Sequence, residues 1–185
     1  MYPESIITKK DQEIVTARVK SEDHYKNSMT KNRGKYVGFM TERKFMGWCQ
    51  KMGFDCRQTN THNDDFLVNG KTVDVKAKLR NVITNGHHEA SVWKSSMSHQ
   101  KPEFYVFGSV LKNRIVQLIG WLEYDQFLSL SRIMNKGMDQ GNMSIVEDCR
   151  NVYHWQTNSM DSFMKVKPED QTTDEWLADY NKTEE

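Results

Sequence analysis

The chain has 185 residues, a length that suits one domain with a full hydrophobic core. With 26 basic and 25 acidic residues its formal net charge is +1, so the overall charge points to no particular partner. Its three cysteines show no disulfide-framework spacing, the N-terminus lacks a signal-peptide pattern, and no apolar run approaches transmembrane length. These features argue against a disulfide-rich secreted domain and an integral membrane protein, and we expect a cytoplasmic protein.

The charge is unevenly distributed along the chain. Residues 161–185 contain 8 acidic and 3 basic residues, which leaves 23 basic and 17 acidic residues in 1–160. A mildly basic body with an acidic tail fits a nucleic-acid partner, although ordinary enzymes show the same pattern. We expect an N-terminal helical extension (1–30), a core domain (31–160) and an acidic, partly flexible tail (161–185). The methionine- and asparagine-rich composition would suit a phage-encoded protein that acts in its host cell.

Two helices are predicted first. Thr8 is a residue type that caps helices, and a thin apolar stripe follows it at Ile14, Val15 and Val19. A stronger helix is predicted over 35–52, with Gly53 as its stop. The positions that share one face of this second helix are Gly38, Glu42, Phe45, Cys49 and Met52.

A β-hairpin is predicted over residues 65–79, after a first strand over 54–61. Asn69-Gly70 is the strongest short-range signal for a two-residue type I′ turn. Counting outward from the turn pairs Val68 with Lys71, Leu67 with Thr72, Phe66 with Val73, and Asp65 with Asp74. Because side chains alternate along a strand, one face collects Asp65, Asp74 and Lys76. The other face is apolar and collects Phe66, Val68, Val73, Val75 and Ala77.

The remaining elements complete a mixed layer fold. Strand formers are concentrated in Phe104–Leu111. The other predictions, in chain order, are a turn at Asn85-Gly86, a short helix over 91–99, a strand over 115–122, a helix over 123–133, a loop over 134–150 and an edge strand over 152–156. This order predicts an α/β fold with a central mixed β-sheet flanked by helices.

The arrangement of Glu42 on a helix, Asp65 at a strand start and Asp74-Val75-Lys76 resembles the PD-(D/E)XK nuclease superfamily. The resemblance covers about residues 34–125 and implies a restriction-endonuclease-like core, similar to small phage and archaeal members. The proline that names the motif is absent, because Asp64 precedes Asp65. That leaves two candidates for one metal ligand; the hairpin register favours Asp65, and a bulge would reverse the choice.

The resemblance implies a metal-dependent DNA endonuclease that hydrolyses phosphodiester bonds with Mg²⁺, for which Mn²⁺ would substitute. Carboxylates suit Mg²⁺, so Asp65 and Asp74 are the first candidates for its ligands. The Val75 carbonyl is a third ligand that the family implies. Lys76 would position or deprotonate the attacking water, or offset charge in the transition state. Glu42 would hold a metal-bound water or a second metal.

Further residues are weaker candidates. Lys35, within the basic patch Lys31/Arg33/Lys35, and Lys78 would contact phosphates, with a solvated surface as an equal alternative. Family members often use a polar residue on the next helix, for which Gln100 and His99 are the candidates. Bases could stack on tryptophans, with core packing as the default, at Trp48, Trp93 and Trp121. The adjacent pair His87-His88 does not predict a zinc site, because neighbouring side chains point apart.

The expected partner is DNA, duplex or branched. A homodimer is expected as well, because cutting both strands usually requires two active sites. Three alternatives remain open: an inactive nucleic-acid-binding protein on the same fold, a structure-specific resolvase of the Holliday-junction kind, and a hydrolase or structural domain without a nucleic-acid partner.

Overall fold

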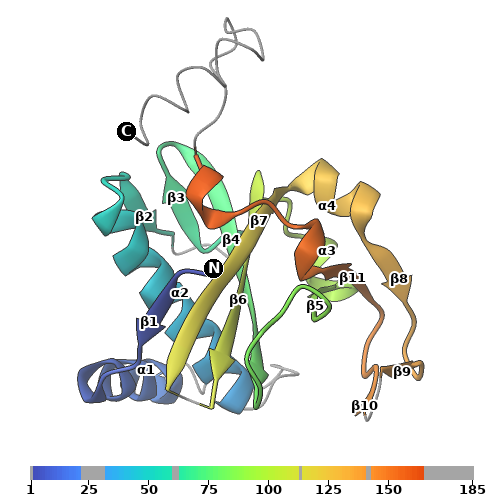
Figure 1. The fold of residues 1–185 in the computed structure, drawn as a ribbon, viewed down its shortest axis with the longest axis horizontal. Helices are drawn as coiled ribbons and strands as arrows, with labels where there is room; N and C mark the ends of the chain where they lie inside the picture. Colours follow the sequence, from blue (N-terminus) through green and yellow to red (C-terminus); the bar gives the residue numbers. More distant parts are fainter. Residues whose placement is uncertain (1, 22–31, 60–62, 113, 141–142, 165–185) are drawn as a thin grey trace, which may run out of the picture.

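The protein is described by a computed structural model over residues 2–21, 32–59, 63–112, 114–140 and 143–164. Its centre is a mixed six-stranded sheet with helices packed against it (Figure 1). The strands of this sheet, in chain order, are β1 (Glu4–Ile6), β2 (Cys56–Gln58), β3 (Phe66–Val68), β4 (Lys71–Arg80), β6 (Phe104–Leu111) and β7 (Ile115–Glu123). They lie in the order β1-β7-β6-β4-β3-β2, with β4 and β6 parallel and the other pairs antiparallel. The predicted α/β class with a central mixed sheet is therefore confirmed.

Two helices form the layer on one side of the sheet. α1 (Lys9–Ser21) begins at the predicted cap, where the Thr8 hydroxyl accepts from the Asp11 N–H at 3.2 Å. Its buried face consists of Asp11, Val15 and Val19, whereas Ile14 is 41% exposed, so the prediction for Ile14 is wrong. In place of Ile14, α1 buries the carboxylate of Asp11 against the helix that follows it in the chain.

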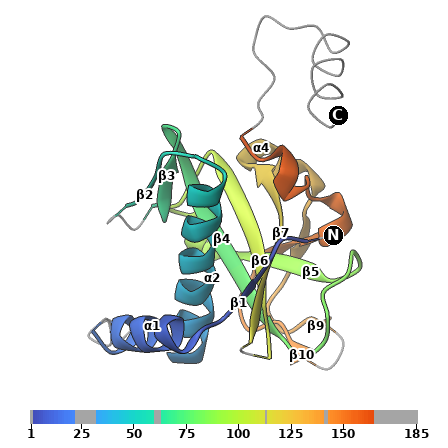
Figure 2. The same ribbon diagram turned by 60° about the vertical axis from the view of Figure 1, so that its left-hand side comes forward.

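α2 (Asn32–Lys51) is longer and runs along the face of the sheet (Figure 2). Phe45 and Cys49 on its inner face are fully buried, as their shared spacing predicts. The helix ends at Lys51, and Gly53 follows with a φ of 77°, the left-handed conformation that suits a helix stop. Met52 lies beyond the end and is 44% exposed, so it does not share the buried face as predicted.

The hairpin of β3 and β4 has the predicted turn and register. Asn69 and Gly70 have φ values of 47° and 81°, as a type I′ turn requires. The observed pairs are Val68 with Lys71, Leu67 with Thr72, and Phe66 with Val73. The fourth predicted pair lies outside this ladder, because the Asp65 N–H donates to the Val73 carbonyl at 3.0 Å. The regular pairing therefore begins at Phe66 and does not include Asp65.

The two faces of the sheet belong to two hydrophobic clusters. On the α2 side, Val73 and Val75 join Phe45 and Phe66 in the larger cluster, which confirms the predicted apolar face of the hairpin. On the other side, Tyr105 and Phe107 pack with side chains of a second layer. That layer consists of α4 (Tyr124–Leu130) and a three-stranded sheet, β5 (Glu89–Trp93), β11 (Cys149–Tyr153) and β8 (Arg132–Met134).

The second layer is where the element predictions were wrong. The predicted helix over 91–99 is instead β5 followed by the short α3 (Lys94–Met97), and the predicted helix over 123–133 ends at Leu130. The predicted loop over 134–150 contains β9 (Asp139–Gln140) and β10 (Met143–Ser144), and the edge strand over 152–156 is the central strand β11. β11 buries polar Asn151 between β5 and β8, which hides the apolar alternation that identifies a strand.

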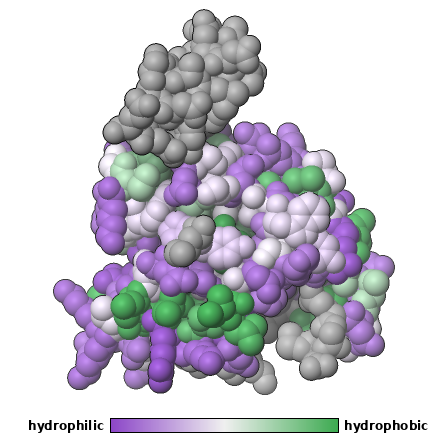
Figure 3. All heavy atoms as spheres, in the orientation of Figure 1, coloured by the Kyte–Doolittle hydropathy of each residue, from purple (hydrophilic) through white to green (hydrophobic). Residues whose placement is uncertain are grey.

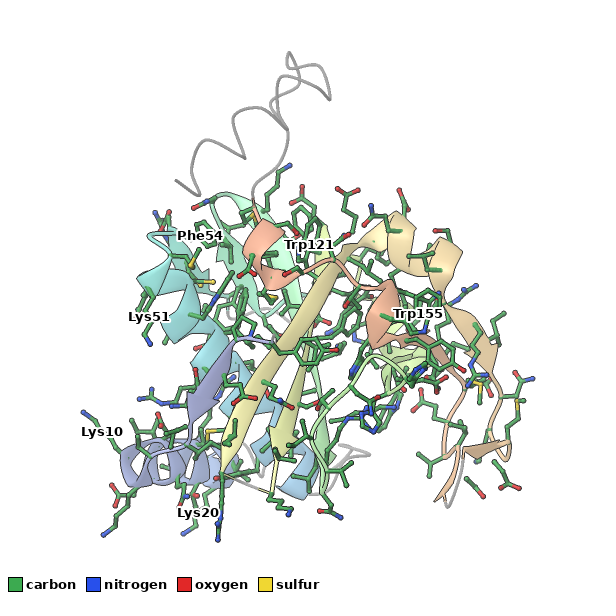
Figure 4. All side chains as sticks on the ribbon, in the orientation of Figure 1. Lys10, Lys20, Lys51, Phe54, Trp121 and Trp155 are labelled. Carbon is green, nitrogen blue, oxygen red and sulfur yellow. The ribbon has the colours of Figure 1, made fainter. Side chains whose placement is uncertain are left out.

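The segment after β11 closes the larger cluster. Its two short 3-10 turns are His154–Gln156 and Met160–Ser162. Phe163 is 1% exposed and packs edge-on against aromatic rings of α2, β6 and β7. Trp48 and Trp121 belong to the same cluster, in line with core packing, whereas Trp155 is 64% exposed on the far side of the molecule (Figure 4).

Among the helices that the structure describes, none is both long and apolar enough to span a membrane. Apolar side chains gather near β1 and the start of α1 (Figure 3), where Ile6 is 75% exposed. The labelled lysines of α1, Lys10 and Lys20, point away from the body (Figure 4).

Candidate functional site

Asp74 and Lys76 lie on the polar face of β4, opposite the apolar face formed by Val73 and Val75. Asp74 is 1% exposed, and its Oδ2 lies 2.7 Å from the Lys76 ammonium. Lys76 also donates to the Gln100 Oε1 at 3.1 Å. Gln100 follows α3 in the chain, so the structure brings this weak candidate to the charged pair.

Asp65 lies at the bend that precedes β3 and is tied to β4. Its Oδ2 accepts from the Val75 N–H at 2.7 Å, one residue along the strand from Asp74. Burial, followed by the charges of Asp74 and Glu42, raises the pKa of Asp65 well above its usual range, although the Val75 hydrogen bond and Lys76 oppose this. Asp74 and Glu42 therefore both lie within electrostatic reach of Asp65.

Asp64 is held differently. Its backbone carbonyl accepts from the Thr59 hydroxyl at 2.5 Å, and its side chain is half-buried. The carboxylate that reaches the backbone of β4 is the one from Asp65. Of the two candidates, Asp65 is thus the one whose orientation is fixed against the strand that carries Asp74.

Glu42 reaches the region from α2, on the opposite face of the sheet. It is 7% exposed, and the Arg18 Nη1 of α1 donates to its Oε2 at 2.8 Å. The Arg18 guanidinium in turn lies 3.7 Å from the centre of the Phe39 ring. The Gln58 amide is next to both charges: its nitrogen is 3.3 Å from Glu42, and a reversed amide would accept from Arg18 at 2.7 Å. These side chains surround a cavity of about 110 Å³.

Arg18 was missed by the sequence analysis. Its position in the last turn of a charge-rich helix gave no sign of a long-range partner. A buried glutamate on the following helix was the only available signal, because buried carboxylates require a cation or hydrogen-bond donors.

Two predicted phosphate contacts lie near the group without joining it. Lys78 is half-buried on the same face of β4 as Lys76, and burial, followed by the charge of Arg80, lowers its pKa to about 8. Lys35 is half-buried near the start of α2, about two helical turns before Glu42. In the same basic patch, Lys31 lies outside the described residues and the side chain of Arg33 is not described. His99 contacts Ser98, its Nδ1 lying 3.4 Å from that hydroxyl oxygen.

Tyr105 is a second neighbour that the sequence analysis missed. It is the Cα partner of Asp74 in the parallel pairing of β4 and β6, and it is 0% exposed. Burial, followed by the charge of Asp74, raises its pKa. Within the described part of the chain, the Tyr105 hydroxyl has no hydrogen-bond partner, whereas the buried Asp74 Oδ2 lies 2.7 Å from the Lys76 ammonium. The sequence pattern identifies Tyr105 only as a strand-forming residue.

The donor set suits Mg²⁺ held in part by substrate. Asp65 supplies a carboxylate from the bend before β3 and Asp74 supplies one from β4, where its Oδ2 is a buried acceptor paired with Lys76. No group of three His, Cys, Asp or Glu residues in the described ranges is placed to hold a metal by itself. Mg²⁺ is typically bound through one or two carboxylates together with waters and phosphates, so two carboxylates fit its chemistry.

Comparisons with family models, with curated proteins and with solved structures found no match to this chain. The resemblance to the PD-(D/E)XK nucleases therefore stays a prediction that depends on Glu42, Asp65, Asp74 and Lys76.

Proposed function

We propose that the protein is a Mg²⁺-dependent DNA endonuclease with a restriction-endonuclease-like core. The observation that carries this proposal is the crowding of Asp65, Asp74 and Lys76 at one end of a hairpin whose other face is hydrophobic core. An acid whose pKa is raised by neighbouring acids, as that of Asp65 is, lowers stability unless something compensates, and such clusters are typical of functional sites. A divalent cation would compensate for this repulsion.

The order of the elements supports the proposal. The Glu42 helix is followed by the hairpin with Asp65 and Asp74, and then by β6 and β7. This is the order on which the resemblance to the superfamily depends. α2 contacts β4, β6 and β7, so the helix that carries Glu42 is packed on the same strands as the site.

Each side chain has a role in this proposal. Mg²⁺ would lower the pKa of a bound water and stabilise charge on the attacked phosphate. Asp65 and Asp74 would hold the cation, together with the Val75 carbonyl that the resemblance implies. Lys76 would position the attacking water, with its ammonium group oriented by Gln100. Glu42, held by Arg18, would bind a metal-bound water or a second metal.

The substrate we propose is DNA, duplex or branched, with Lys35 and Lys78 contacting phosphates. Mn²⁺ would replace Mg²⁺, because it also accepts oxygen ligands in octahedral geometry. A homodimer would supply the second active site for cutting both strands, and the proposed setting is the cytoplasm.

A cleavage screen tests the proposal. Duplex, single-stranded, flap and branched DNA would be incubated with the protein in Mg²⁺, in Mn²⁺ and in EDTA. Asp74→Asn provides the inactive variant, and Asp125→Asn, which changes an exposed carboxylate of α4, is the matched control. We expect metal-dependent cleavage that Asp74→Asn abolishes and Asp125→Asn retains.

Two outcomes would contradict the nuclease. Equal cleavage by the wild type and by Asp74→Asn would assign the activity to something other than this site. Binding of DNA without cleavage of any form would favour the inactive nucleic-acid-binding protein, and a cut confined to branched DNA would favour a resolvase.

A further inference from the structure

Tyr105 is the strand partner of Asp74, and its buried hydroxyl makes no packing contact that requires it. The ring of Tyr105 packs on Phe127, with centroids 5.0 Å apart, and is stacked with Phe107 and Tyr124. These contacts involve the ring alone, and a phenylalanine would make them equally well. Buried polar groups are nearly always hydrogen-bonded, so a phenol oxygen without a partner in the described structure requires an explanation.

The position of Tyr105 supplies that explanation. Residues paired across parallel strands lie on the same face of the sheet, so Tyr105 and Asp74 share a face. Asp74 Oδ2 is likewise buried, and it lies 2.7 Å from the Lys76 ammonium. A buried donor without a partner in the described structure and a buried carboxylate paired with a single lysine ammonium thus occupy paired positions on the same face of the sheet.

Other donors on this face are already engaged. Thr72, two residues before Asp74, has a hydroxyl that accepts from the Glu103 N–H at 2.9 Å and donates to the Glu103 carboxylate at 3.4 Å. Lys76 is in contact with Asp74, but the proposed reaction requires its ammonium at the water or phosphate. Once Lys76 moves, the Tyr105 hydroxyl is a buried donor on the same face that is not engaged by any described residue.

We infer that Tyr105 is a positioning residue, whose hydroxyl donates to the Asp74 carboxylate, directly or through one water, and fixes its orientation toward the bound cation. This inference rests on the proposed metal-dependent function. Carboxylates that bind metals are commonly held by a further hydrogen bond, and losing such a partner costs about 10- to 100-fold in metal affinity or activity. Burying the Tyr105 hydroxyl without a partner lowers the free energy of unfolding, and the proposed role in metal binding would explain why a tyrosine occupies this position.

Tyr105→Phe tests the inference, with Tyr124→Phe as the matched control on the ring stacked against it. Calorimetric titration with Mg²⁺ and with Mn²⁺ in the absence of DNA would report metal affinity, and cleavage would be measured across a range of Mg²⁺ concentrations. For Tyr105→Phe we expect metal affinity to fall about tenfold, and the half-saturating Mg²⁺ concentration to rise equally. Its midpoint of urea unfolding should match or exceed that of the wild type, because an unsatisfied hydroxyl is removed. Tyr124→Phe should change none of these quantities.

The outcomes separate this inference from the proposed function. Wild-type metal affinity and cleavage in Tyr105→Phe would overturn the positioning role while leaving the nuclease intact. A wild-type protein that binds metal without cleaving DNA would contradict the nuclease, and calorimetry would still decide the role of Tyr105. If the wild-type protein binds neither Mg²⁺ nor Mn²⁺, both the role of Tyr105 and the proposed nuclease function are overturned.

Discussion

Two buried carboxylates of this protein lie in opposite surroundings. Asp11 of α1 is 5% exposed and accepts from Lys44 at 2.6 Å and from Arg43 at 2.7 Å, both on α2. Although burial alone would raise it, these hydrogen bonds and those from Thr8 lower the pKa of Asp11 well below its usual range. Asp74 is 1% exposed and is next to one cation, Lys76, and a further acid whose pKa is raised.

The difference separates a structural ion pair from a candidate reaction site. The Asp11 cluster is satisfied as it stands and joins α1 to α2. The group around Asp74 concentrates like charge and leaves the buried Tyr105 hydroxyl without a hydrogen bond from the described residues. Burial and charge are similar in both places, so the decisive property is whether the fold itself completes the hydrogen bonding.

The largest effect is expected from the cation of the proposed site. Lys76→Gln retains an N–H donor but removes the charge, so the attacking water and the phosphate lose their positioning group. We expect DNA cleavage to fall by about 10²- to 10⁴-fold, the range for loss of an acid–base group. Single-turnover cleavage with saturating Mg²⁺ measures it. Lys94→Met, on a lysine that is 77% exposed, is the control and should cleave normally. An active Lys76→Gln would remove Lys76 from the proposed reaction.

Asp11→Asn should instead affect the fold. We expect the free energy of unfolding at pH 7 to fall by about 2–3 kcal/mol, as for the loss of hydrogen bonds to charged groups. Because the folded pKa is lowered, the stabilisation by Asp11 is present above the unfolded value of about 3.9 and is lost as pH falls through the folded pKa. Urea unfolding between pH 7 and pH 3 measures both.

Asp55→Asn is the matched control for Asp11→Asn. Asp55 forms an ion pair with Arg57 at 2.8 Å, but both side chains are more than half exposed. Solvent screens such pairs, so the expected loss is below about 1 kcal/mol. Equal losses in the two variants would show that the burial of Asp11 does not decide its contribution.

The sequence predicted the hairpin and its polar residues but not their neighbours. The Asn69-Gly70 turn sets the register locally, so the faces of β3 and β4 followed by counting. Arg18 and Tyr105 reach the site through packing between distant segments, which no local pattern encodes. The second sheet was missed for a related reason, because β11 buries Asn151 where alternation would require an apolar residue. Asp65 was placed correctly near Asp74, although its backbone leaves the ladder that predicted this.

Asp65→Asn should raise the free energy of unfolding at pH 7, whereas Asp11→Asn should lower it. Because the folded pKa of Asp65 is raised, its contribution to stability is present below the unfolded value of about 3.9 and is lost as pH rises through the folded pKa. Asparagine has no charge to repel Asp74 and retains an oxygen to accept from the Val75 N–H. We expect unfolding at pH 7 to require about 1 kcal/mol more than in the wild type, a typical gain on relief of functional strain.

Urea unfolding at pH 7 and pH 3.5, with and without Mg²⁺, measures this gain. The advantage of Asp65→Asn should shrink at low pH, where the wild-type carboxyl is protonated, and in saturating Mg²⁺, which neutralises the same repulsion. A variant less stable than the wild type at pH 7 would show that Asp65 resembles Asp11 and contributes to the fold.

The smallest effect, on DNA affinity, is expected at Lys78. Like the residues of the proposed site it is half-buried on β4, but it is a base and not an acid. With its pKa lowered to about 8, Lys78 is charged at pH 7 and loses its proton as pH rises toward 9. If it contacts a phosphate, Lys78→Met should weaken DNA binding a few-fold and reduce the slope of log affinity against log salt by about 1. The DNA affinity of the wild type should also fall between pH 7 and pH 9, more steeply than that of the variant.

Fluorescence anisotropy with a labelled duplex in Ca²⁺ measures the salt slope and the pH dependence of DNA affinity. Lys94→Met is the exposed-lysine control. An unchanged salt slope would place Lys78 off the DNA path.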